Sequence, residues 1–363
     1  MHPETENIFG CNALGSFSPK PNPITGLCDC KSLVNGLYCD QCKLGSFYLN
    51  SESSNGCFEC FCFGITNSCT AAFNLYRDYV ELKLDEYVIR NIKLRDRHSN
   101  IDPIKHEQLQ FDHINRELLY KQHFLSTDLY WQLPSQFLSN KITSFGGYLN
   151  YTFRYEGIIS PELENNNQTP IAILIGRNIT LHYRCSVESF LPIVTNLISI
   201  PIQEKVWFFE NGKPASRPDI LTVLSHLDTI LLRATFGPQV HLVALNTVLL
   251  ETTIEQQNFQ SSYRVETIEE CHCPIGYTGR SCEKCAPGYK ISSMFRLLDR
   301  IGFQTTHERL FSCEPCFCNG HSNSCDPETG NCVVSIYSTV LYFLLFLLFF
   351  FFFFFFLLFL FFL

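Results

Sequence analysis

The sequence predicts a mainly β protein in which disulfide-rich modules flank a larger antiparallel, jelly-roll-like β-sandwich, with a hydrophobic segment at the C-terminus. Three observations predict this class. The 19 cysteines of the 363-residue chain form two clusters of nine, with a single cysteine between them. The roughly 200 residues between the clusters contain stretches that alternate apolar and polar side chains, as half-buried strands do. The segment after the second cluster contains neither cysteine nor charge.

The composition excludes some classes of protein. Segments above roughly 8–10% cysteine form disulfide scaffolds, because they contain too little apolar core to fold otherwise. A cytosolic enzyme of ordinary composition therefore does not fit. The net charge is −8, with 27 basic and 35 acidic residues. No basic cluster stands out, so nucleic acid is not an expected partner.

The two cysteine clusters repeat one another. The pattern C-D-C-(8)-C-D-Q-C from Cys28 matches C-H-C-(8)-C-E-K-C from Cys271. The pattern C-F-E-C-F-C-(6)-C from Cys57 matches C-E-P-C-F-C-(6)-C from Cys313. These spacings indicate an internal repeat that is interrupted by an insertion of about 200 residues.

Repeated C-x-x-C elements also suit zinc sites, so two interpretations compete. The C-x-C elements and the eight-residue gaps suit zinc poorly. Three N-glycosylation sequons, at Asn150, Asn167 and Asn178, fit a secreted chain. Disulfides are therefore favoured, and we expect no metal, no cofactor and no catalytic residue.

The inserted region contains recognisable strand signals. Period-two alternation over residues 149–156 and 178–185 predicts two half-buried strands, with Asn150 and Asn178 on the polar side. Cys185 falls on the apolar side, where a buried thiol is favoured over an intermolecular bridge. Pro218 and Asp219 open a predicted short helix at 218–227. Further strands are predicted at 206–210, 230–236, 240–245 and 247–254.

The cysteine clusters resemble laminin-type EGF-like modules. The run from Cys316 to Cys332 resembles the opening of such a module, and the run from Cys271 to Tyr289 resembles the second half of one. The eight cysteines of that family pair 1–3, 2–4, 5–6 and 7–8. Cys11 and Cys28 would be the third and fourth cysteines of a module whose start is missing, and they would be unpaired, as would Cys185. Carried over by position, the resemblance implies the pairs Cys30–Cys39, Cys42–Cys57, Cys60–Cys69, Cys62–Cys271, Cys273–Cys282, Cys285–Cys313, Cys316–Cys325 and Cys318–Cys332.

The inserted region resembles the laminin IV type A domain. The run from Tyr130 to Tyr151 is similar to the signature of that domain, and residues 219–236 are similar to its later helix and strand. The family places this domain inside an EGF-like module, between its third and fourth cysteines. The insertion between Cys69 and Cys271 falls at that point. A Cys62–Cys271 bond would close a very long loop, which contributes about 5 kcal/mol in the chain-entropy model.

The resemblance implies six segments along the chain. They are an N-terminally truncated EGF-like module (1–58), the first part of an interrupted module (59–69), the laminin IV type A sandwich (70–270), the second part of the interrupted module (271–315), a truncated module (316–332) and a Phe/Leu-rich tail (333–363).

The resemblance also implies a function. We expect a non-enzymatic structural protein of the extracellular matrix or basement membrane, part of a laminin α or γ chain or a perlecan-like parent. It would act as a disulfide-linked rod and spacer that supports cell adhesion and tissue organisation. Its partners would be other matrix proteins or laminin chains and cell-surface receptors.

Two alternatives remain open. Residues 340–363 are long enough to span a bilayer, which would make the chain a membrane-anchored adhesion protein at the plasma membrane. Eight consecutive phenylalanines at 349–356 without a cationic flank favour translated non-coding sequence instead. A glycan-binding sandwich that uses Trp131 and Trp207 is the second alternative, although core positions suit these aromatic side chains better.

Overall fold

The computed structural model contains two compact units, each built from two separate stretches of chain. The larger unit comprises residues 1–60 and 69–270, and the smaller unit comprises residues 61–68 and 271–363. The structure describes residues 10–51, 53–84, 89, 91–97, 109–121, 128–159, 169–186, 190–255, 263–292, 312–319, 322 and 324–333.

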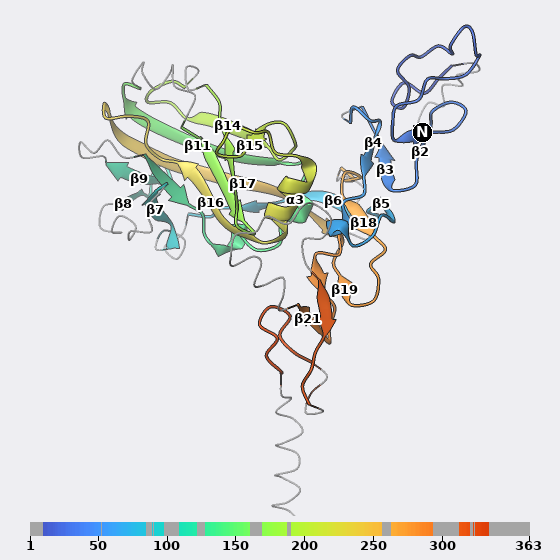
Figure 1. Cartoon of the computed structure of the whole chain (residues 1–363). Coiled ribbons are helices and arrows are strands. Elements are labelled where there is room, and N and C mark those ends of the chain that lie inside the picture. Colours follow the sequence, from blue (N-terminus) through green and yellow to red (C-terminus); the bar gives the residue numbers. More distant parts are fainter. Residues whose placement is uncertain are drawn as a thin grey trace, which may run out of the picture. The chain divides into compact units, whose positions relative to one another are not determined.

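Most of the larger unit is a β-sandwich of two antiparallel sheets (Figure 1). The first sheet has the strand order β15-β13-β12-β16-β10-β7. Its strands are Trp207–Phe208 (β15), Ile179–Tyr183 (β13), Ala172–Gly176 (β12), Leu227–Arg233 (β16), Leu129–Gln132 (β10) and Lys93–Asp96 (β7).

The second sheet is organised around one long strand, β17. One edge of β17 pairs with β11, while the other edge pairs first with β9 and then with β6. The strand order is β14-β11-β17-β9-β8, with β6 beside the second half of β17. The strands are Asn196–Pro201 (β14), Tyr148–Gly157 (β11), Val240–Glu255 (β17), Glu117–Lys121 (β9), Leu109–Asp112 (β8) and Leu75–Glu81 (β6).

The sandwich core follows from the alternation seen in the sequence. Along β11, Leu149 and every second residue up to Tyr155 are buried, while the residues between them are partly exposed. Phe153 stacks on Phe236 with the ring centroids 4.9 Å apart, next to Tyr155. Burying large aromatic side chains of this kind contributes much of the apolar area of a core.

Several predicted elements need correction in extent. The strands predicted at 240–245 and 247–254 are one continuous strand, β17. The strand predicted at 178–185 ends at Tyr183, so Cys185 lies beyond it, and the strand predicted at 206–210 is reduced to two residues. Hydrophobic periodicity does not show at which residue the pairing with a neighbouring strand begins or ends.

The predicted short helix is present as α3, Arg217–Ser225. Ser216 is its N-cap: the backbone N–H of Asp219 donates to the Ser216 hydroxyl, and the Ser216 backbone N–H donates to the Asp219 carboxylate. This reciprocal capping box satisfies two backbone N–H donors at the start of the helix. Pro218 fits the first turn, because a backbone N–H at that position would have no acceptor within the helix and proline lacks one. Two 3₁₀ turns, Ser135–Phe137 (η3) and Ile142–Ser144 (η4), precede β11.

The modules that precede and follow the sandwich in the sequence are built from two-residue to four-residue strands. The repeat inferred from the cysteine spacing is visible in their conformation: Cys39 and Cys282 have φ of 58° and 59°, and Gly36 and Gly279 have φ of 90° and 98°. The first module contains Val34–Asn35 (β1), Gln41–Cys42 (β2), Ser46–Leu49 (β3) and Cys57–Glu59 (β4). The remaining elements are Cys62–Gly64 (η1), Cys69–Ala71 (β5), Glu269–Cys271 (β18), Tyr277–Thr278 (β19), Lys284–Cys285 (β20), Tyr289–Ile291 (β21) and Cys313–Pro315 (β22).

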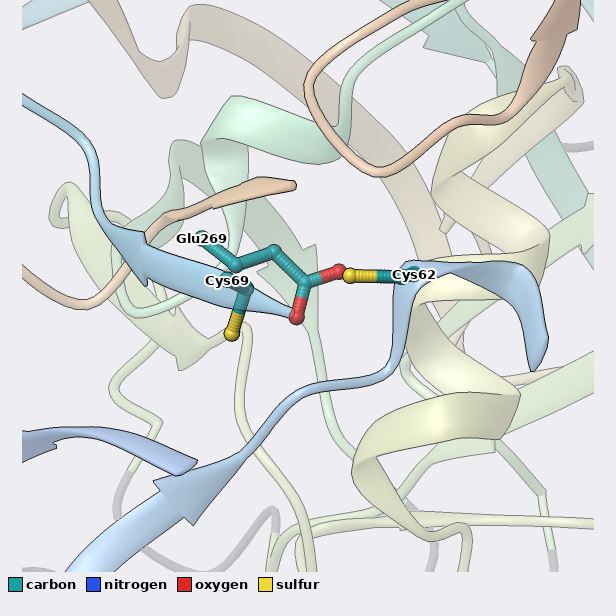
Figure 2. A group of neighbouring side chains, drawn as sticks. All are labelled: Cys62, Cys69 and Glu269. Atoms are coloured by element: carbon teal, nitrogen blue, oxygen red, sulfur yellow. The ribbon is translucent and has the colours of Figure 1, made fainter. Parts of the chain in front are cut away.

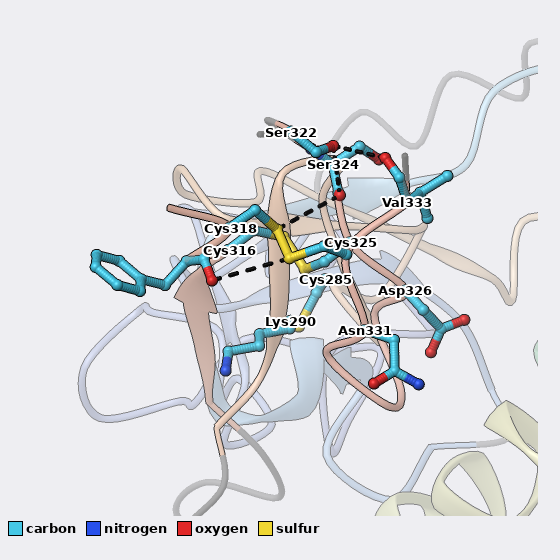
Figure 3. Close-up of a disulfide and its surroundings, with 12 residues drawn as sticks. Cys285, Lys290, Cys316, Cys318, Ser322, Ser324, Cys325, Asp326, Asn331 and Val333 are labelled. Atoms are coloured by element: carbon cyan, nitrogen blue, oxygen red, sulfur yellow. Dashed lines mark hydrogen bonds between the residues drawn. A yellow bond between two sulfur atoms is a disulfide. The ribbon is translucent and has the colours of Figure 1, made fainter. Parts of the chain in front are cut away.

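The structure contains nine disulfides. Eight are the pairs that the resemblance implies, including Cys316–Cys325 beside Cys318 (Figure 3). The ninth corrects our expectation: Cys11 and Cys28, predicted to be unpaired, are bonded to each other.

The error lay in the position assigned to Cys11. Cys11 and Cys28 are separated by 17 residues and Cys318 and Cys332 by 14, and the latter are the second and fourth cysteines of their module. Cys11 therefore occupies the second position of its module and pairs with the fourth. Cys185 is free, as predicted.

Candidate functional junction of module and sandwich

The two ends of the sandwich lie side by side. Strand β5, where the chain enters, pairs with β18, where it leaves. The backbone N–H of Ala72 donates to the carbonyl of Ile268 at 2.8 Å, and the N–H of Val265 donates to that of Leu75 at 2.8 Å. Leu75 also faces Glu255 across the β6–β17 ladder. The inserted sandwich thus begins and ends at one place.

Arg217, the first residue of α3, lies where the first module meets the sandwich. Its guanidinium carbon lies 5.4 Å from the ring centroid of Phe47, 5.6 Å from that of Phe58 and 5.4 Å from that of Phe145. Phe47 and Phe58 belong to the module, and Phe145 belongs to the sandwich. The side chain of Arg217 is only 8% exposed. Desolvated cation–π contacts are worth about 2 kcal/mol, so this position ties the two parts together.

The polar edge of the same guanidinium joins both parts as well. One terminal nitrogen of Arg217 donates to the carbonyl of Glu59 in the module at 2.8 Å. The other donates to the carboxylate of Glu269 in the sandwich at 3.0 Å, and the side chain of Glu269 is 1% exposed. A planar guanidinium can stack through its faces while its edge donates hydrogen bonds, which an ammonium cannot do. Together, these residues form the Arg217 junction: Arg217, Phe47, Phe58, Glu59, Phe145 and Glu269.

Three nearby side chains have the types found in metal sites (Figure 2). Zinc binds cysteine as a thiolate. The sulfur of Cys62 is bonded to Cys271, and that of Cys69 is bonded to Cys60. The Glu269 carboxylate accepts from Arg217. None of the three therefore offers a free ligand, and the arrangement serves cross-linking.

Comparison with known families agrees with this architecture. A model of the laminin B domain (domain IV) matches residues 130–269, and a model of the laminin EGF domain matches residues 10–57 and 262–295. This chain carries a laminin B domain and laminin EGF domains. The strands of the laminin B domain extend further than the matched residues, because β6 to β9 (75–121) belong to the same two sheets.

Relatives are found among large proteins. A basement membrane proteoglycan of Caenorhabditis elegans is 33% identical over 90% of this chain and 9% of its own length. The mouse basement membrane-specific heparan sulfate proteoglycan core protein is 33% identical over 89% of this chain and 8% of its own. Human laminin subunit alpha-1 is 27% identical over 84% of this chain and 10% of its own length. The chain thus spans about a tenth of these relatives. The solved L4b domain of human laminin alpha-2 aligns at 22% identity and a TM-score of 0.42, covering 50% of this chain and 99% of that one.

The predicted sequons lie at different kinds of position. The strand predicted for Asn178 is wrong at this residue: Asn178 is exposed and lies in the two-residue turn between β12 and β13, where Arg177 and Asn178 both have positive φ. Such a turn favours asparagine. Asn150 lies on the outer face of β11, and its side-chain carbonyl accepts from the hydroxyl of Ser199 at 2.6 Å. Asn167 lies outside the described residues.

The aromatic side chains considered for glycan binding are in the core. Trp131 and Trp207 are both fully buried. The indole N–H of Trp207 donates to the carbonyl of Pro201 at 2.9 Å. Since neither ring reaches the surface, the structure contradicts a sugar platform built on these two residues.

The remaining predicted features concern a thiol and a membrane span. Cys185 is half-buried in the laminin B domain, where burial raises the pKa of its thiol and Arg233 partly opposes that shift.

Within the part of the chain that the structure describes, no helix is long and apolar enough to cross a membrane. The proposed anchor at 340–363 lies outside that part.

Our reading of the sequence missed the Arg217 junction. A signal was nevertheless present in the repeat. Phe47 and Phe58 face each other across β3 and β4, whereas the matching positions of the next module hold Lys290 and Glu314, which form an ion pair at 3.4 Å. The second module has an ion pair where the first has two aromatic side chains, and this difference indicates that the first module contacts another part of the protein there.

Proposed function

We propose that this chain is a non-enzymatic structural segment of an extracellular matrix protein. Its laminin EGF modules would form a disulfide-linked rod, and its laminin B domain would be a spacer held firmly on that rod. The Arg217 junction carries the proposal, because it joins the first module to the laminin B domain through three aromatic rings and two polar contacts. A firm junction is what a spacer needs and what a flexible linker would lack.

We further propose the segment boundaries given by the resemblance, with the laminin B domain at 70–270 inside a module formed by 59–69 and 271–315. The family matches and the β5–β18 pairing support these limits. We propose extracellular deposition in basement membrane, with other matrix proteins, laminin chains and cell-surface receptors as partners. The names of the relatives support this proposal. N-glycans at Asn150, Asn167 and Asn178 belong to the same proposal.

The rigidity of the junction can be tested with a variant that the chain itself suggests. Phe47→Lys with Phe58→Glu installs the ion pair of the second module, so the module should still fold while the aromatic contacts with Arg217 are lost. Fluorophores attached through non-natural amino acids at Leu44 and Ile114, both highly exposed, would report the distance between module and sandwich in single molecules.

We expect one narrow transfer-efficiency peak for the unmodified chain and a broad distribution for the variant. A broad distribution in the unmodified chain would contradict a firm junction. Matrix association is measured separately, by adding the purified, oxidised chain to cells that assemble a basement membrane. Retention in the insoluble matrix is expected. Recovery only in the medium would contradict the matrix role.

A further inference from the structure

The Cys62–Cys271 disulfide creates a short covalent route past the laminin B domain. The two cysteines are 209 residues apart in sequence, yet their Cα atoms are 5.9 Å apart. Of the nine disulfides, it is the one that encloses the domain. A chain pulled from both ends transmits tension from residue 62 directly to residue 271. The enclosed residues stand outside that route.

The laminin B domain would resist tension poorly if it were placed in the route. Its ends are the paired strands β5 and β18, followed by contacts between residues 72–77 and 263–268 and then by the β6–β17 ladder. Because both ends leave from the same side, a pulling force would separate these strands laterally. Hydrogen bonds of an antiparallel ladder lie across the strands, so that force would load them one after another. Strands sheared along their length would instead share the load among all bonds.

We propose that the Cys62–Cys271 bond is a mechanical bypass: it carries tension from module to module and leaves the laminin B domain folded while the rod is stretched. The inference deepens the proposed structural role, in which matrix tension reaches the rod. Its consequence is that a surface displayed by the laminin B domain keeps its shape at any tension that the disulfide withstands. Without the bond, the same tension would unfold that surface.

The length released by losing the bond gives a quantitative test. In a Cys62→Ser, Cys271→Ser variant the Cys60–Cys69 disulfide still shortens the route, so the added length runs from residue 69 to residue 271, which is 271 − 69 = 202 residues. At about 3.5 Å per extended residue this is about 700 Å. The matched control Cys273→Ser, Cys282→Ser opens a separation of 9 residues and adds only about 30 Å.

The experiment is force spectroscopy on the full oxidised chain, with one handle before Cys11 and the other after Cys332. We expect no extension of about 700 Å in the unmodified chain or in the control, and such an extension at low force in the Cys62→Ser, Cys271→Ser variant. An oxidised, unmodified chain that extends by about 700 Å would overturn the bypass. So would a folded variant that shows no such extension.

A second measurement covers the case in which the serine variant does not fold. A protease site is inserted at the exposed Asn211–Gly212 turn of the otherwise unmodified chain and is cut after folding. The handles should stay joined under tension until a thiol reductant is added. Separation before reduction would refute the bypass. Failure of matrix retention would affect the proposed matrix role and leave this result standing, so the two proposals fail separately.

Discussion

Removing Arg217 should destabilise the laminin B domain far more than removing an exposed arginine. In Arg217→Ala, the Glu269 carboxylate, 1% exposed, loses the cation 3.0 Å away. Taking one partner from a buried ion pair costs about 3–5 kcal/mol, because the remaining charge stays in a poorly solvating site. Loss of the three ring contacts adds to this cost. We therefore expect the free energy of unfolding to fall by at least about 3 kcal/mol.

The assay is equilibrium unfolding in urea with the disulfides intact. The chain contains two tryptophans, Trp131 and Trp207, and both lie in the core of the laminin B domain, so their fluorescence reports on that domain alone. Arg97→Ala is the matched control. Arg97 pairs with Glu210, which is 73% exposed, and exposed pairs contribute at most about 1 kcal/mol.

Two further variants separate the contributions to this loss. Arg217→Lys keeps the charge but lacks a planar group that can stack and donate simultaneously, so its cost should lie between those of the alanine variant and the unmodified chain. Arg217→Met with Glu269→Gln removes both charges and should cost less than Arg217→Ala alone. The reasoning is refuted if Arg217→Ala costs less than about 1 kcal/mol, or if Arg97→Ala costs as much.

Three other outcomes follow from particular positions. Ile193 has φ of 70°, a conformation that costs a β-branched residue about 1–2 kcal/mol, and its side chain is 71% exposed. Ile193→Asn should therefore raise the free energy of unfolding, measured in urea, by about 1 kcal/mol. A decrease in that free energy would contradict the prediction. The oxidised chain should contain 19 − 2 × 9 = 1 thiol. Burial raises the pKa of the Cys185 thiol, so less of the reactive thiolate exists at a given pH. The rate of iodoacetamide labelling should therefore reach its midpoint at a higher pH in the folded chain than in urea. Equal midpoints would contradict this effect of burial. A chain secreted from eukaryotic cells should lose one N-glycan in mass on Asn178→Gln, and an unchanged mass would show that the turn is not modified.

Cysteine spacing and hydrophobic periodicity carry different amounts of structural information. Spacing alone identifies the repeat, because the gaps between matching cysteines are identical in the two clusters. It misplaced Cys11 because a module that lacks two of its cysteines can be aligned in more than one way. Period-two alternation identifies β11, which has one buried and one solvated face. It is silent for β12, whose first three residues are all buried. A strand with both faces covered has no polar phase to reveal it.

The Arg217 junction could not be read from periodicity, since its members come from residues 47 to 269 and meet only in three dimensions. The repeat nevertheless contains the means of finding it. The two modules pair in the same register at the first two positions of this ladder, so the residues at those positions can be compared directly. At the facing positions of the two-stranded pair, one module holds Phe47 and Phe58 and the other holds Lys290 and Glu314. Two aromatic rings at a solvent-facing position would be unfavourable without a partner, and Arg217 supplies that partner at 5.4 and 5.6 Å. At this pair of positions the first module therefore contacts the laminin B domain through Arg217, whereas the second module holds an ion pair.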